Sequence, residues 1–221
     1  MINYELRCTH AVGRQHGVKS PKEGFQMKRK RSISTKTLTL AGLLTAIVVV
    51  LQLLGSFIRL GPFSVSLVLI PIVIGAATCG TAVGAWLGLA FGITVLASGD
   101  AASFLAVHVA GTVLTVLVKG IACGFFASVV YRLLERFNRY VAVVAAAVVC
   151  PVVNTGVFLI GCKFFFWETV AMWAEGLGFA NATAYAFLGL AGANFLFELG
   201  FNILLSPVIL RLLNIRQKQN A

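Results

Sequence analysis

Six apolar segments, each long enough or nearly long enough to cross a lipid bilayer, constrain this chain more than any other feature. The hydrocarbon core of a bilayer is about 30 Å thick, which requires about 20 apolar residues in a helix. Segments of this kind follow one another along the sequence with little polar chain between them. Their approximate bounds are 37–58, 64–80, 81–98, 105–131, 141–163 and 184–210.

The composition supports a membrane protein. Of the 221 residues, 59% are hydrophobic and 11% are charged, whereas soluble domains carry about 25% charged residues. A chain this apolar cannot cover a water-soluble globule with polar side chains. We therefore predict an all-α membrane protein, in which residues 37–213 form a bundle of six transmembrane helices.

The two ends of the chain are polar. Residues 1–36 hold nine of the 18 Lys and Arg residues, and residues 214–221 form a second polar tail. Residues 1–26 lack the apolar stretch of a signal peptide, and Met27 opens the basic stretch "MKRKRSISTKT". We expect the native chain to start at Met27, with residues 1–26 as a misannotated extension.

The distribution of basic residues predicts the orientation. Cytoplasmic loops of membrane proteins are enriched in Lys and Arg. Here these residues gather in the first tail, in the loop "YRLLERFNRY" and in the final "RLLNIRQKQ", so both termini should lie in the cytoplasm. Because no aromatic residues alternate with the basic ones, we expect no nucleic-acid partner.

Lys119 lies in the middle of an apolar run, "TVLTVLVKGIACGFF". A charge at the bilayer centre costs about 2.5–3.5 kcal/mol on insertion scales, so it should face the bundle interior, a cavity or a partner charge. Glu198 is the one acidic residue deep in a predicted helix, and Asn194 precedes it by one turn. Asn154, near Pro151, lies at a similar depth.

Two interpretations of these polar residues stay open. In the first, Lys119 and Glu198 form a structural ion pair that only fixes the register of their helices. In the second, they line a ligand pocket, where Lys119 faces a substrate carboxylate and the amides hydrogen-bond the rest of the molecule.

Small residues recur at helical spacing in two segments. Gly42 and Ala46 lie four residues apart in the first segment, and a run of four glycines has the same spacing in the third. Such spacing places small residues on one helix face, where backbones can approach closely. The face either packs within the chain's own bundle or docks another membrane subunit. The glycines of the third segment are Gly80, Gly84, Gly88 and Gly92.

Catalytic and nucleotide-binding motifs are absent from the sequence. It contains no Walker motif, no HExxH and no CxxC. One loop contains Asp100, Ser103 and His108, but no GxSxG motif accompanies them. We therefore expect no enzyme activity, no cofactor and no metal site, and any transport would draw its energy from elsewhere.

Several stretches resemble a known family of transport proteins. The basic start, "AGLLTA", "GPFSVSLVLIPIVIGAATCGTAVGAWLGLAFG" and "CPVVNTGVFLIG" are similar to the substrate-binding S components of energy-coupling factor (ECF) transporters. The resemblance covers residues 27–215. It is strongest to the branch that contains pantothenate, folate and riboflavin binders.

The resemblance implies a function and a set of partners. An S component of a bacterial plasma membrane binds a vitamin or related nutrient from outside. It then docks on a membrane coupling subunit driven by two cytoplasmic ATPase subunits. The alternative from a different class is a small ion-coupled carrier or channel that uses Lys119 and Glu198 as a gate and acts without ATPase subunits.

The resemblance also suggests roles for individual residues. Gly42 and Ala46 match the positions through which the family's first helix contacts the coupling subunit. The family's pocket lies among helices four to six, which makes Lys119, Asn154 and the residues of the last helix substrate-binding candidates. The loop between the first two helices would form a lid, with Arg59, Gly61, Phe63 and Ser64 in or near it.

Overall fold

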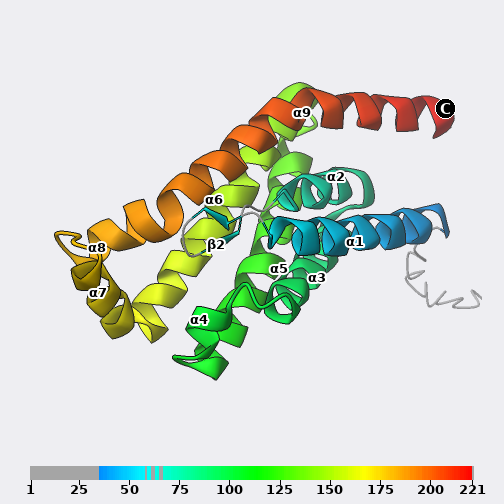
Figure 1. The fold of residues 1–221 in the computed structure, drawn as a ribbon. Helices are drawn as coiled ribbons and strands as arrows, with labels where there is room; N and C mark the ends of the chain where they lie inside the picture. The colour runs from blue at the N-terminus through cyan, green and yellow to red at the C-terminus, as the bar shows by residue number, and fades with distance from the viewer. Residues whose placement is uncertain (1–34, 58, 61–62, 65–66, 221) are drawn as a thin grey trace, which may run out of the picture. The chain divides into compact units, whose positions relative to one another are not determined.

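The computed structural model describes residues 35–57, 59–60, 63–64 and 67–220, and within these ranges it is almost entirely helical (Figure 1). The predictions for residues 1–26 and for most of the first polar tail lie outside the described residues, as does Gly61.

Within the described residues, four helices are long and apolar enough to cross a membrane. They are α1 (Thr35–Gly55), α5 (Val109–Leu134), α6 (Arg139–Phe165) and a last stretch over Ala182–Ile215. Large apolar side chains such as Leu188 and Leu204 are 70% exposed, which suits contact with lipid and not with water. The four helices match four of the six predicted segments.

The other two predicted segments form shorter helices, α2 (Leu69–Cys79) and α3 (Thr81–Ala97). At 1.5 Å per residue, α2 is about 17 Å long and does not reach across a hydrocarbon core by itself. Pro71, a residue type that kinks helices when it lies in their interior, lies in the first turn of α2. A proline is tolerated there, since its missing N–H would have no partner within the helix.

Helices α2 and α3 form a tight hairpin. Gly80 alone separates α2 from α3, with a φ of 94°. A positive φ is costly for residues that carry a Cβ. Glycine at this position therefore allows the chain to reverse within one residue.

Short elements join the long helices. The strands β1 (Arg59–Leu60) and β2 (Phe63–Ser64) pair antiparallel between α1 and α2. The one-turn helix α4 (Ala102–Leu105) precedes α5, and α7 (Trp167–Gly176) follows α6. The last stretch begins with α8 (Ala182–Ala184), continues as a π-helix, η1 (Tyr185–Gly192), and ends as α9 (Ala193–Asn220).

The centre of the bundle is α5, which packs against α3 on one side and α6 on the other (Figure 1). Helix α6 in turn packs against α9. The buried side chains between these helices are mostly small or β-branched, including Ala127, Ala142, Val143 and Ala146. Close packing of small residues is the main source of helix association in lipid, where apolar burial gives little driving force.

Candidate functional site

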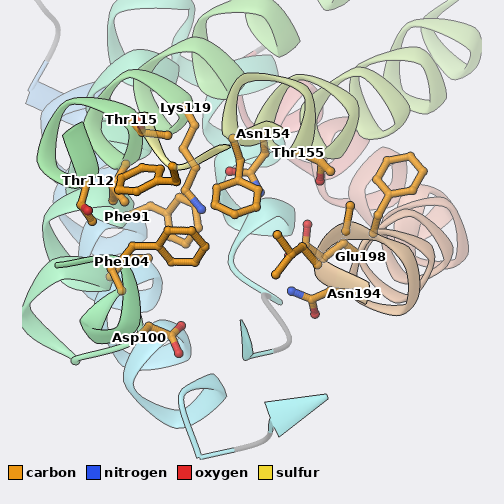
Figure 2. A pocket seen from close by; sticks show the side chains of 18 residues that line it. Phe91, Asp100, Phe104, Thr112, Thr115, Lys119, Asn154, Thr155, Asn194 and Glu198 are labelled. Atoms are coloured by element: carbon orange, nitrogen blue, oxygen red, sulfur yellow. The ribbon is translucent and has the colours of Figure 1, made fainter. Parts of the chain in front are cut away.

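A cavity lies among α3, α5, α6 and the last helical stretch, with the α3–α4 turn and α4 at one end (Figure 2). Its empty volume is about 730 Å³, part of which is open to solvent. The wall carries five aromatic side chains, namely Phe91, Phe104, Phe158, Phe166 and Phe195, and eight polar ones, namely Asp100, Thr112, Thr115, Lys119, Asn154, Thr155, Asn194 and Glu198.

Lys119 extends from α5 into this cavity (Figure 2). Its ammonium nitrogen lies 5.7 Å from the ring centroid of Phe91 and 5.5 Å from that of Phe158. Aromatic faces attract a cation at this distance, and the attraction grows when water is excluded. The two rings thus hold the charge in an apolar setting inside the bundle.

Glu198 and Asn194 reach the cavity from α9, on the wall opposite Lys119 (Figure 2). Glu198 is only 4% exposed. Its carboxylate and that of Asp100 act electrostatically on Lys119. Yet among the described residues no ion pair within 4.0 Å joins Lys119 to either carboxylate. The structure therefore lacks the direct Lys119–Glu198 pair of the first interpretation.

The cavity wall holds buried polar atoms without a hydrogen-bond partner among the described residues, among them Oδ1 of Asn154 on α6 and Oγ1 of Thr115 on α5. Each residue is 5% exposed. A buried polar atom without a partner costs about 1–3 kcal/mol, so folding gains nothing by placing it there. Such atoms in a cavity wall are the ordinary mark of a site that binds something polar.

Asp100 belongs to the α3–α4 turn and lines the cavity at that end (Figure 2). The amide Nε2 of Gln52, on α1, donates a hydrogen bond of 3.0 Å to its Oδ2. Gln52 is 1% exposed. This bond fixes the carboxylate and ties α1 to the cavity wall.

The comparison with protein families decides the identity. A family model described as "ECF transporter, substrate-specific component" matches residues 36–210. The chain belongs to this family. Searches of curated proteins and of solved structures return no match. The membership makes the protein a substrate-binding component of a transport system, which works with other ECF transporter components, and its apolar helices suit a multi-pass membrane protein.

Four of the predicted substrate-binding residues of this S component lie together. Lys119, Asn154, Asn194 and Glu198 come from three different helices and all line the one cavity. Their contact with a substrate stays a prediction. The predicted lid roles of Arg59 and Phe63 also stay predictions, because their side chains lie outside the described part of the chain.

Sequence reasoning missed the threonines, Asp100 and the aromatic residues of the wall. A signal for two of them was present, since Thr112 and Thr115 precede Lys119 by seven and four residues and so share its helix face. The S component's phenylalanines gave no such signal. They number 17 in this chain, and only the rotation of each helix decides which ones face inward.

The glycines of the third predicted segment pack within the S component itself. A Cβ built on Gly84, Gly88 or Gly92 would meet backbone atoms of α5, and all three glycines are buried. The glycine face of α3 thus packs against α5 of the same chain. The prediction that these three glycines dock a partner subunit is therefore corrected. Gly80 forms the hairpin, where a Cβ would meet the guanidinium of Arg132.

The small residues of α1 behave differently. Gly42 and Ala46 are both exposed, and a Cβ built on Gly42 would meet nothing within 4 Å. This face of α1 is open in the described structure. Docking through it stays a prediction.

Proposed function

We propose that this S component captures a vitamin or related small nutrient and delivers it into the cell by ATP-driven uptake. The observation that carries the proposal is the cavity inside an apolar bundle, with a lysine, two amides and two carboxylates in its wall. Polar groups at membrane depth are costly and are kept where they line a substrate path. The family membership supplies the role of substrate binding.

The proposed setting is the plasma membrane of a bacterium, with six membrane crossings and both termini in the cytoplasm. The basic residues support this orientation. Arg132, Arg136 and Arg139 cluster where α5 ends and α6 begins, and Arg211 lies near the end of α9. Lys and Arg residues concentrate on the cytoplasmic side.

The proposed partners are a membrane coupling subunit and two cytoplasmic ATPase subunits. Support comes from the family and from the sequence, which carries no nucleotide-binding motif of its own. The open Gly42 and Ala46 face of α1 offers a surface on which another helix can approach closely.

An experiment with reconstituted vesicles tests the function. The S component is inserted into liposomes alone, with the coupling module, and with a module whose ATPases cannot hydrolyse ATP. A defined mixture of water-soluble vitamins is offered, and the compounds inside are identified by mass spectrometry. We expect accumulation only with the active module. Accumulation by the S component alone would contradict the proposal and favour an ion-coupled carrier or channel.

A further inference from the structure

The charge of Lys119 has no direct counter-ion in the described structure. Its ammonium group faces the rings of Phe91 and Phe158, and no hydrogen bond or ion pair joins it to a described residue. A cation in a desolvated site pays for its burial only when an anion or several acceptors reach it. The site is therefore built to receive a negative group at this end of the cavity.

The charge of the wall limits how negative that group can be. Among the described lining residues Lys119 is the single cation, while Asp100 and Glu198 are acidic. A phosphate monoester carries about −1.5 to −2 charges near neutral pH. It would bring an excess of negative charge next to two carboxylates. A single carboxylate matches one ammonium group.

The amide oxygen of Asn154 adds a second requirement. It and the Thr115 hydroxyl lack a hydrogen-bond partner among the described residues, and both residues line the same cavity as Lys119. A carboxylate can accept a hydrogen bond from the Thr115 hydroxyl, but it cannot satisfy the Asn154 oxygen, because it has no hydrogen to donate. A hydroxyl, amine or amide N–H elsewhere on the same molecule can.

From these three observations we infer that the substrate is a monocarboxylic acid with at least one hydroxyl, amine or amide N–H donor. This inference rests on the proposed function and specifies its substrate class. The carboxylate pairs with Lys119, and the donor bonds the amide oxygen of Asn154. The Thr115 hydroxyl bonds a polar group of the same molecule, and the apolar part lies against the phenylalanines of the wall.

A retention assay with matched compounds tests the substrate class. The purified full-length S component is incubated with an equimolar mixture of acids and their neutral counterparts: pantothenate with panthenol, biotin with biotinamide, 4-aminobenzoate with 4-aminobenzamide, and nicotinate with nicotinamide. Retained compounds are identified by mass spectrometry after gel filtration, and the dissociation constant of each is then measured.

Lysine variants make the assay specific for the site. Lys119→Met and Lys119→Gln both remove the charge, and Lys163→Met is the matched control, because Lys163 is exposed and its ammonium group lies 3.7 Å from the ring centroid of Trp167. We expect retention of an acid and not of its counterpart, and at least a tenfold loss of affinity in both Lys119 variants. Lys163→Met should bind as the wild type does. Thr115→Val should weaken binding about threefold to tenfold.

Three outcomes would overturn the inference. They are retention of a neutral compound in preference to its acid, unchanged affinity for the acid in both Lys119 variants, and retention of no compound by the folded protein. Co-purification with the coupling module is measured in parallel and separates this failure from that of the proposed function. An S component that joins the module but retains a neutral compound keeps its function and loses only the substrate class.

Discussion

Gly88 on α3 and Gly120 on α5 pack backbone against backbone. A Cβ added to Gly88 would meet the carbonyl oxygen of Gly120, and a Cβ added to Gly120 would meet that of Gly88. The same reciprocal contact joins Gly84 to Gly124 one turn away. This close approach brings α3 and α5 together beneath the cavity wall that Phe91 and Lys119 form.

Replacing Gly88 by alanine should therefore destabilise the protein. At an open helix position, replacing glycine by alanine stabilises the helix by up to about 1 kcal/mol. At Gly88 the added methyl group instead meets the backbone of Gly120, which cannot move aside. Overpacking of this kind lowers the free energy of unfolding by about 1–3 kcal/mol. Each kcal/mol lost lowers the Tm of a chain of this size by about 2–4 °C. Thermal unfolding in detergent measures it.

Gly200→Ala is the matched control for that experiment. Gly200 also lies within a helix, but a Cβ built on it meets nothing within 4 Å. Its Tm should stay the same or rise. Equal effects of the two substitutions would show that the α3–α5 contact is not the cause.

Thr115→Val should make the protein more stable and weaken substrate binding. The substitution keeps the shape of the side chain and removes a buried hydroxyl that has no described partner. Removing such a group gains about 1 kcal/mol. A gain in stability together with a loss in function is typical of a binding site. Thermal unfolding and the retention assay give the two readouts.

Thr94→Val provides the contrast. Thr94 is a buried threonine on α3 whose hydroxyl donates a hydrogen bond of 2.8 Å to the carbonyl of Ala90. Losing a satisfied bond should lower stability by about 1 kcal/mol and leave binding unchanged. A Thr115→Val protein that is less stable than this control would argue against an unpaired hydroxyl.

The long helices could be predicted from the sequence because length and apolar content decide them. The shorter and irregular parts could not. Helix α7 lies outside every predicted segment, since a ten-residue helix of mixed composition lacks the long apolar run by which membrane-spanning segments are recognised. In the π-helix η1 the ring of Tyr185 packs beside Gly189, a contact that a pattern of apolar residues does not reveal.

The same distinction applies to the cavity. Lys119, Asn154, Asn194 and Glu198 could be predicted because each is a costly residue in an apolar helix, and such residues need an interior to face. Phe104 and Phe158 could not, because a phenylalanine side chain packs as well against lipid as in the protein interior. The carboxylate of Asp100 lies in a turn, where an acidic residue costs nothing and so gives no signal.

Gln52→Leu should destabilise the protein and disturb the cavity. The Nε2 of Gln52 donates the hydrogen bond that fixes Asp100. A hydrogen bond to a charged group contributes about 1.5–3 kcal/mol. Gln52→Glu should cost more still, because it places one carboxylate beside another. Thermal unfolding should rank the wild type first, Gln52→Leu second and Gln52→Glu last, and a Gln52→Leu protein as stable as the wild type would contradict the role assigned to this bond.

Gly42→Leu should leave the isolated S component folded but impair its assembly with the coupling subunit. Gly42 is exposed, and a Cβ built on it meets nothing within 4 Å, so a larger side chain can point away from the bundle. On a helix that docks through small residues, a leucine would hold the partner away. Gly200→Leu makes the same substitution on α9, at a position with equally open space. Co-purification of tagged S component with the coupling module should fall at least tenfold for Gly42→Leu and stay near wild type for Gly200→Leu. Equal recovery of the module with both variants would place the docking surface on another helix.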